Sequence, residues 1–317
     1  MRGDVFRAAK QSELLAALLG TGTQLLVMAL GSIIGALASS MYVDKGALTV
    51  SGLGLYAVTS ILAGFVSGSF YRSSHFPKEG KKWKYSMFLT ASLMPSLAGT
   101  VVIAMSVVAA YHRTLNAVPV GTMASIFLAW LAVSLPLVIV GTYLGRSLCG
   151  RVKAPMRVNP EPRPVSNRPL YAHPAVLSIA AGLLPFASIV IELYFVLTSF
   201  WGYRFYFVYG FMLAIFVILI LVTACSSVVV TYAILSGEDH RWHWAAFGAG
   251  ASSAAYVFLY ASYYFLFKTS MHGLLQTSVY FGYTLLGCAA LGMATGTVGY
   301  ASASTFVRLI YGQLRAD

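Results

Sequence analysis

Charged side chains are scarce in this sequence. Of its 317 residues, 9% are Asp, Glu, Lys or Arg, whereas 58% are hydrophobic. Soluble domains carry about 25% charged residues, so the composition excludes a water-soluble globular protein. Almost all the charges lie between long apolar stretches, and Glu192 is the one acid deep inside such a stretch.

Cysteine is also scarce, with three residues in the chain. Cys225 and Cys288 fall within apolar stretches, and Cys149 lies at the end of one. Small proteins that depend on disulfides are rich in cysteine. We therefore expect no disulfide framework.

Catalytic and metal-binding motifs are missing as well. The sequence contains no HExxH, no GxSxG, no glycine-rich phosphate loop and no pair of aspartates within its apolar stretches. These patterns mark common hydrolases and nucleotide-binding enzymes. His240 and His243 lie at a loop-to-helix boundary with Arg241 between them, so we expect them to anchor a helix at the membrane interface rather than to bind metal. We expect neither an enzyme nor a cofactor.

Long apolar stretches account for most of the sequence. About 20 apolar residues cross the ~30 Å hydrocarbon core as a helix, because a helix satisfies its backbone hydrogen bonds internally. The sequence predicts eight such helices, at residues 14–41, 47–71, 85–110, 120–145, 173–200, 205–235, 243–267 and 273–307. The predicted fold class is all-α, a polytopic membrane bundle with eight transmembrane helices, and its first partner is the lipid bilayer.

The basic residues lie mainly on one side of these predicted helices. The chain has a net charge of +12 and 21 Lys and Arg residues, of which the gaps on the other side hold only Lys45, Arg113, Arg204 and Lys268. An excess of Lys and Arg in cytosolic loops is the usual orientation signal of membrane proteins. Both termini are therefore predicted to be cytosolic, and the positive charge is explained without a nucleic-acid partner.

The predicted organisation is two four-helix halves joined by a linker. A cytosolic segment covers 1–13, the first half 14–145, the linker 146–172, the second half 173–307 and a cytosolic tail 308–317. The linker is basic and rich in proline, so we expect an extended cytosolic spacer.

Glu192 is the sharpest candidate for an intramembrane site. A charged side chain at that depth costs at least ~2.5–3.5 kcal/mol on insertion scales, so it must face protein or water. Glu192 follows Pro185 by two helical turns, on the face that a proline kink would open. Two roles stay open, namely structural hydrogen bonding and the binding of an ion, proton or ligand.

Small residues form a second kind of candidate site. Four GxxxG pairs each place two glycines on one face of a predicted helix: Gly31/Gly35, Gly64/Gly68, Gly141/Gly145 and Gly292/Gly296. Such faces let helix backbones approach closely in a membrane. They serve either packing within this bundle or docking of a client's transmembrane helix.

Several short motifs follow one another in an order that is specific as a set. They include GDVFR at 3–7, GTGTQ at 20–24, KKWK at 81–84, LPF at 184–186, IEL at 191–193 and TGTVG at 295–299. This set extends over essentially the whole chain and resembles the nonaspanin family, also described as the nine-transmembrane superfamily or endomembrane protein 70.

The resemblance implies a role in sorting and localising other membrane proteins in Golgi and endosomal membranes, by recognition of client transmembrane helices. It also implies a fragment or truncated member, because family members carry a lumenal domain and a first span before this region. Family tails commonly end in a signal read by coatomer, and Arg315 and Asp317 stand where that signal has a lysine and an acid. Ser226 and Ser227 stand near a position where the family leads us to expect an acid.

A different class of function stays open beside this one. A secondary transporter or channel would use Glu192 as an ion or proton site and Pro185 as a helix break. The arrangement in two halves suits that class, although the halves show no internal repeat. A third hypothesis, an intramembrane hydrolase, would need a second ionisable group within hydrogen-bond reach of Glu192.

Overall fold

The protein is mainly helical. Its computed structural model describes residues 3–38, 45–73, 83–111, 119–150, 169, 173–202, 209–269 and 273–313. No β-strand occurs among these residues. In chain order the main elements are a 3₁₀ turn η1 (Asp4–Phe6) and the helices α1 (Ser12–Ala38), α2 (Lys45–Ser73), α3 (Trp83–Tyr111), α4 (Val120–Ala129), α5 (Leu135–Leu148), α6 (Pro174–Ala181), α7 (Leu183–Gly202), α8 (Tyr209–Ser236), α9 (Trp242–Ala251), α10 (Ser253–Lys268) and α11 (Leu274–Gln313). The predicted all-α fold class is confirmed.

Seven helical stretches among the described residues are long and apolar enough to cross a membrane. They are Ser12–Leu37, Val50–Ser73, Trp83–Tyr111, Gly121–Leu148, Pro174–Thr198, Met212–Ser236 and Leu274–Gly312. The eighth predicted span, 243–267, corresponds to α9 and α10, two helices of 10 and 16 residues separated at Ser252. Neither is long enough to be counted by itself, so one predicted span is present in two parts.

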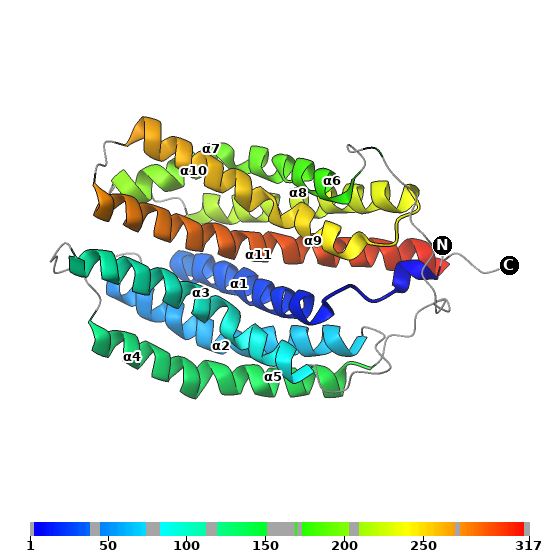
Figure 1. Ribbon diagram of the computed structural model, residues 1–317, viewed down its shortest axis with the longest axis horizontal. Coiled ribbons are helices and arrows are strands. Elements are labelled where there is room, and N and C mark those ends of the chain that lie inside the picture. The colour runs from blue at the N-terminus through cyan, green and yellow to red at the C-terminus, as the bar shows by residue number, and fades with distance from the viewer. Residues whose placement is uncertain are drawn as a thin grey trace.

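Two helices form the centre of the bundle. Helix α1 contacts α2, α3, α8 and α11, and α11 contacts α1, α3, α8, α9 and α10. Figure 1 shows α2–α5 on one side of this central pair and α6–α10 on the other. The helices before and after the proline-rich linker therefore meet through α1 and α11. Most of the predicted linker, 151–168 and 170–172, lies outside the described residues.

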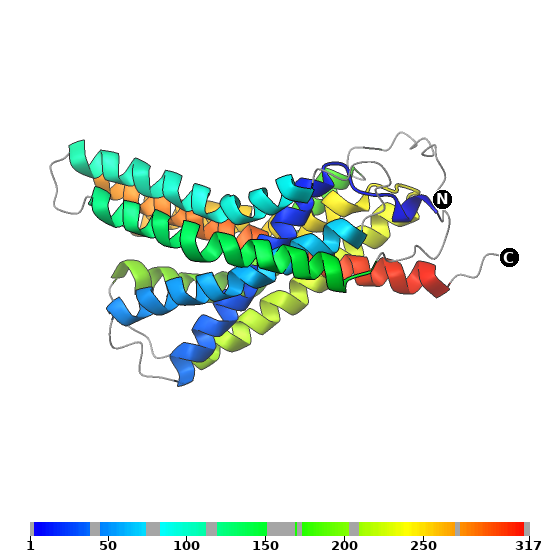
Figure 2. The ribbon, with the colours of Figure 1, turned by 90° about the horizontal axis from the view of Figure 1, so that it is seen from below.

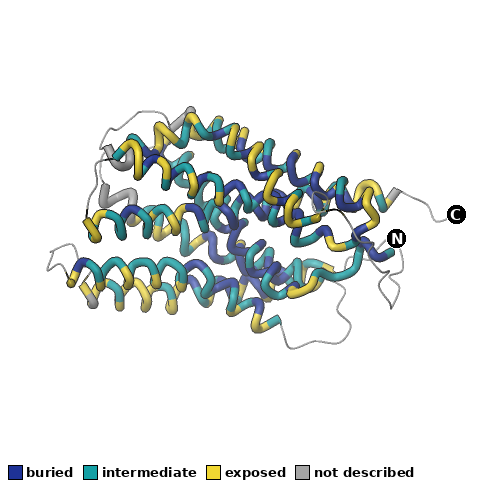
Figure 3. The backbone as a smooth tube through the Cα atoms, turned by 45° about the horizontal axis from the view of Figure 1, so that its top comes forward, coloured by how far each residue is buried: buried dark blue, intermediate teal, exposed yellow. Residues whose placement is uncertain are grey.

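The helices are joined most closely at the end of the bundle where η1 and the last turns of α11 lie. Val5, Leu15, Ile234, Trp242 and Val307 belong to one buried cluster there. Figure 3 shows the buried residues concentrated in this part and in the middle of the bundle. Toward the opposite end α1 and α8 diverge from α11 (Figure 2). The bundle is thus packed tightly at one end and spreads toward the other.

Pro95 lies inside α3 without ending the helix. A proline has no N–H to bond the carbonyl four residues earlier, so the Ala91 carbonyl loses its helical partner. The Trp130 indole N–H donates to that oxygen at 3.2 Å. Trp130 begins a π-helical turn, Trp130–Ser134, which joins α4 to α5 immediately before Pro136. The irregular turn beside Pro136 therefore presents a donor to the carbonyl that Pro95 leaves without one.

Trp130→Phe is expected to destabilise the protein by about 1–3 kcal/mol, because the Ala91 carbonyl is left without a donor. Pro95→Ala restores a backbone N–H, so the same substitution should cost much less in that background. Thermal unfolding in detergent of the wild type, both single variants and the double variant measures this coupling. An equal loss from Trp130→Phe in both backgrounds would contradict the assignment.

The break between α6 and α7 lies at Gly182, three residues before Pro185. The Gly182 N–H bonds to the Ile179 carbonyl at 3.3 Å, and the Ser178 carbonyl instead accepts a hydrogen bond from Ser252 Oγ at 2.8 Å. A Cβ added at Gly182 would overlap Ser252 Oγ, so the close approach requires glycine. Since Ser252 separates α9 from α10, the two divided spans meet at their breaks.

The segment before α1 is held against α9 by side chains of that helix. The Trp242 indole donates to the Val5 carbonyl at 2.9 Å, and the Trp244 indole donates to the Lys10 carbonyl at 2.7 Å. Val5 is fully buried. Residues 3–11, called the N-terminal strap below, are therefore part of the packed end of the bundle.

His243 adds a third hydrogen bond to the N-terminal strap. Its Nε2 lies 3.0 Å from the Arg7 carbonyl oxygen, and its Nδ1 lies 3.1 Å from the Tyr300 hydroxyl. Because a carbonyl oxygen only accepts, Nε2 carries the hydrogen and Nδ1 of the neutral ring accepts from Tyr300. The Trp242 ring stacks on His243 and on Tyr300, with centroids 4.0 and 5.7 Å away. This histidine thus links the strap to α11.

Asp239 fixes the turn that leads into α9. Its side chain is buried and accepts hydrogen bonds from the backbone N–H of Arg241 at 2.9 Å and from the guanidinium of the same residue at 3.1 Å. The hydrogen bond to Asp239 raises the pKa of Arg241. One carboxylate therefore satisfies both the backbone and the side chain of the residue that precedes the helix.

Candidate functional site

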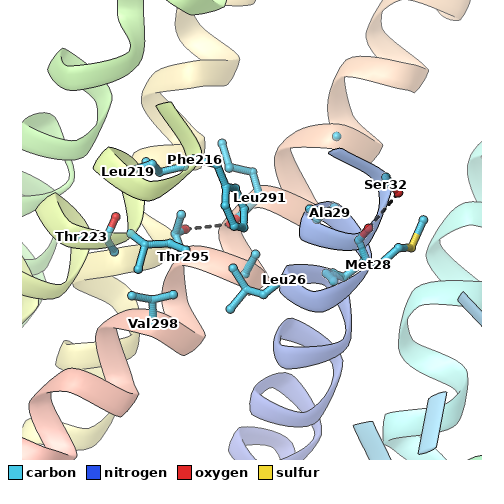
Figure 4. A pocket seen from close by; sticks show the side chains of 15 residues that line it. Leu26, Met28, Ala29, Ser32, Phe216, Leu219, Thr223, Leu291, Thr295 and Val298 are labelled. Carbon is cyan, nitrogen blue, oxygen red and sulfur yellow. Dashed lines mark hydrogen bonds between the residues drawn. The ribbon is translucent and has the colours of Figure 1, made fainter. Parts of the chain in front are cut away.

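A cavity of about 340 Å³ lies between α1, α8 and α11 and is partly open. Its wall is mostly aliphatic and aromatic, and none of its lining residues carries a charge. Figure 4 shows side chains of the three helices around this space, with Phe216 on α8 and Leu26 on α1. Helix α11 contributes small residues, namely Gly287, Ala290 and Ala294. The cavity therefore suits an apolar ligand or side chain, and the small residues of α11 leave space for it on that side.

One polar group in this wall has no partner among the residues that the structure describes. Thr223 is 0% exposed, and its hydroxyl makes no hydrogen bond there. The hydroxyls of Ser32 and Thr295, also in the wall, each donate to a carbonyl of their own helix at 2.8 Å. A buried hydroxyl without a partner lowers stability. Because this hydroxyl is not exposed, a polar group in the cavity could bond to it only after the neighbouring side chains move.

The cavity is smaller than a transmembrane helix. Two turns of α-helix, with a diameter of ~10–12 Å and a pitch of ~5.4 Å, occupy roughly 850–1,200 Å³. A volume of about 340 Å³ therefore holds a few side chains rather than a whole helix. A helix that lies across the opening could insert side chains into it.

Glu192 lies on α7, outside this cavity. It is half-buried, while Pro185 two turns earlier is buried. Ile189 on the same helix belongs to a core cluster with Leu219 of α8 and Val257 of α10. No residue in the described ranges forms an ion pair or hydrogen bond with the Glu192 carboxylate. The second ionisable group that a hydrolase would need is therefore not found in that part of the chain.

Two of the four glycine pairs pack against each other. Gly64 and Gly68 on α2 face Gly141 and Gly145 on α5, and a Cβ added at any of the four would overlap backbone atoms of the facing helix. Both pairs are therefore occupied by packing within the bundle.

The other two glycine pairs contact their neighbours less uniformly. A Cβ at Gly296 would lie 2.7 Å from the Phe247 ring, and one at Gly292 would lie 3.2 Å from Ala254. On α1, a Cβ at Gly31 would meet Leu55 at 3.3 Å, whereas one at Gly35 would meet nothing within 4 Å. The GxxxG pattern thus occurs both where a glycine contacts another helix closely, as at Gly296, and where it faces open space, as at Gly35.

Arg315 and Asp317 lie outside the described residues. Within the described residues, no group of three or more His, Cys, Asp or Glu side chains could hold a metal ion.

None of the residues that line the cavity was a candidate from the sequence. The signal that could have found them is the spacing of Gly287, Ala290 and Ala294, which puts three small residues on one face of α11. Thr223 had no such signal, because a threonine inside an apolar span normally donates to its own helix.

Known proteins similar to this chain match it over its whole length. A family model described as Endomembrane protein 70 matches residues 1–274. The chain is 36% identical over 321 residues to transmembrane 9 superfamily member 4 of Arabidopsis thaliana, 35% over 318 residues to member 9 of the same plant, and 31% over 318 residues to transmembrane 9 superfamily member 2 of Homo sapiens. These matches cover 100% of this chain and 53%, 49% and 47% of the three relatives. The chain therefore spans about half the length of the curated relatives it matches. No solved structure matches it.

Proposed function

The chain belongs to the endomembrane protein 70 family, the nonaspanins, and from this premise we propose that it sorts and localises other membrane proteins by recognising their transmembrane helices. The family resemblance predicted from the short motifs is confirmed. The apolar helices and the relatives also make this an integral membrane protein. The proposed role is non-enzymatic and set in Golgi and endosomal membranes, with both termini cytosolic and coatomer as the partner of the tail residues Arg315 and Asp317.

The observation that carries this proposal is the cavity between α1, α8 and α11. Transmembrane helices gain no hydrophobic free energy by associating, because lipid tails are as apolar as their side chains. They associate instead through close packing at small residues and through interhelical hydrogen bonds. Ala290 and Ala294 supply small residues, and Thr223 supplies a hydroxyl that no described residue satisfies. A client helix with a bulky apolar residue beside a polar one would match this wall.

The glycine pairs of α2 and α5 support the proposal less. Gly64, Gly68, Gly141 and Gly145 each already approach backbone atoms of the facing helix. A client could reach them only if α2 and α5 separated. The cavity needs no such separation, so we place client recognition there.

Ala294→Leu is expected to lower client delivery several-fold without destabilising the protein. The leucine side chain would fill part of the cavity, where added apolar contacts replace empty space. The measurement is the surface fraction of a reporter protein whose transmembrane helix carries a bulky apolar residue beside a polar one, in cells that express only the variant. Ala214→Leu is the matched control, because Ala214 is an exposed alanine on α8 outside the cavity wall.

Thr223→Val separates recognition from stability in the same assay. Removal of a hydroxyl that lacks a partner should raise the melting temperature in detergent, whereas delivery of the polar reporter should fall. Normal delivery in both Ala294→Leu and Thr223→Val would count against client recognition at this cavity.

The transporter alternative gains no specific support from the described residues. Glu192 lines no part of the cavity and forms no ion pair with a described residue. Glu192→Gln in the delivery assay, and in liposomes that contain a pH-sensitive dye, would separate the two classes. Proton flux that this substitution abolishes would favour transport over sorting.

A further inference from the structure

Arg146 and Trp83 form a stacked pair where α3 begins and α5 ends. The guanidinium carbon of Arg146 lies 4.0 Å from the centre of the Trp83 ring, and Lys84 Nζ lies 5.9 Å from the same ring. The Tyr143 ring meets Trp83 nearly edge-on, with centroids 5.4 Å apart. These four residues, called the Trp83 patch below, bring two positive charges and two aromatic rings together.

The charges of the Trp83 patch are not neutralised by any carboxylate in the described part of the chain. Neither Arg146 nor Lys84 forms an ion pair there. Glu13 is the acid on the adjoining helix, and it contacts α3 through its backbone carbonyl, which accepts from Ser86 Oγ at 3.2 Å. Two cations therefore lie near the same ring with no anion of the described chain to balance them.

Helix α2 adds a third positive charge at the same height. The glycine contacts show that α2 and α5 run parallel, with Gly64 against Val138 and Gly68 against Thr142. One turn further along this register, Arg72 reaches the level of Arg146. Both arginines lie in the last turn of their helix, where a positive charge also complements the helix dipole.

The Trp83 patch borders the apolar outer surface of the bundle. Phe88, one turn after Lys84 on α3, is 59% exposed, and Tyr143 in the patch itself is 56% exposed. Exposed apolar side chains on spanning helices face lipid tails, and tryptophan, tyrosine and basic residues are typical of the headgroup level just outside them. The charges of the patch therefore lie where phospholipid headgroups lie.

We propose that the Trp83 patch binds the headgroup of an anionic phospholipid in the leaflet at this end of the bundle. Stacking on Trp83 fixes the plane of the Arg146 guanidinium and leaves its N–H edge for two hydrogen bonds to a phosphate. Lys84 adds a second, more mobile charge, and basic residues at a membrane surface attract anionic lipid. This site is independent of the proposed client cavity between α1, α8 and α11.

The test is lipid retention by the purified full chain. The protein is placed in nanodiscs of phosphatidylcholine with a minor fraction of phosphatidylserine, released into detergent and analysed by native mass spectrometry. Wild type should retain phosphatidylserine above its share of the bilayer. Arg146→Gln should lower that retention about tenfold, equivalent to ~1.4 kcal/mol. Arg146→Lys should lower it nearly as much, because lysine keeps the charge but not the planar stacked group.

Arg308→Gln is the matched control for this experiment. Arg308 is an exposed arginine near the end of α11, so its loss removes one positive charge away from Trp83. Equal losses from Arg146→Gln and Arg308→Gln would mean diffuse attraction and would overturn the site. Retention of phosphatidylserine by the wild type at no more than its share of the bilayer would overturn the site too. So would an increase in melting temperature from inorganic phosphate alone that equals the increase from phosphatidylserine. Unchanged melting temperatures show that each variant is folded.

Discussion

Gly141→Ala is expected to destabilise the bundle by about 3 kcal/mol or more, and Gly141→Leu is expected to prevent folding. A Cβ at this position would overlap the Ile61 carbonyl and lie 3.0 Å from the Phe65 backbone nitrogen. These are backbone atoms of α2, which cannot turn aside as a flexible side chain can. The two helices would have to separate to admit even one methyl group.

The cost is large because the contact is repeated along the whole interface. Gly64 and Gly68 approach the backbone of α5 at Val138 and Thr142, and Gly145 approaches α2 at Phe65. In lipid the helices gain no hydrophobic free energy by associating, so this close packing is what holds them together. Separation at Gly141 would therefore weaken the contacts at the other three glycines.

Gly99→Ala is the control for this prediction. A Cβ at Gly99 on α3 would meet nothing within 4 Å, and alanine favours a helix over glycine by ~1 kcal/mol. That substitution should leave the melting temperature in detergent unchanged or slightly higher. If Gly99→Ala and Gly141→Ala lower it equally, the α2–α5 interface is not as described.

Hydropathy predicted the helices of this protein well because it depends only on the length and apolar composition of each segment. A run of apolar residues must be helical in lipid, whatever its neighbours are. The division of the span at 243–267 was missed because Ser252 is not a helix-breaking residue. At the break Ser252 donates a hydrogen bond to the carbonyl of Ser178, a residue of another helix, and such a contact cannot be predicted from the segment by itself.

The candidate sites were harder to predict because they depend on which helices meet. The sequence singled out Gly35 and Gly141 by the same pattern, yet only Gly141 meets another backbone. Glu192 stood out by its charge, but charge does not reveal that its helix face borders a packed cluster rather than the cavity. The cavity combines residues from three helices, and its small and apolar residues are ordinary in any span.

The N-terminal strap shows the same limit at the end of the bundle. The sequence predicted a cytosolic segment at 1–13 and an interface role for His243. Their contact depends on backbone carbonyls of the strap, which every residue possesses. No side-chain pattern could therefore have indicated that Trp242, His243 and Trp244 hold this segment.

Trp242→Ala is expected to destabilise the protein by about 3–5 kcal/mol and to release the N-terminal strap. Trp242 is 3% exposed, stacks on His243 and Tyr300, and donates to the carbonyl of the fully buried Val5. Its removal leaves a large cavity and a buried carbonyl without a donor. The melting temperature in detergent and the rate of tryptic cleavage after Arg7 measure the two consequences.

Two milder substitutions distinguish the hydrogen bond from the packing. Trp242→Phe keeps an aromatic ring but removes the N–H, so it should cost about 1–3 kcal/mol. Trp244→Phe removes the equivalent bond to Lys10, but Lys10 is exposed and water can replace the lost donor there, so the loss should be smaller. Faster cleavage after Arg7 in Trp242→Phe than in Trp244→Phe would show that burial of the accepting carbonyl sets the strength of the strap. The opposite order would mean that the strap is held mainly at its α1 end, beside Lys10.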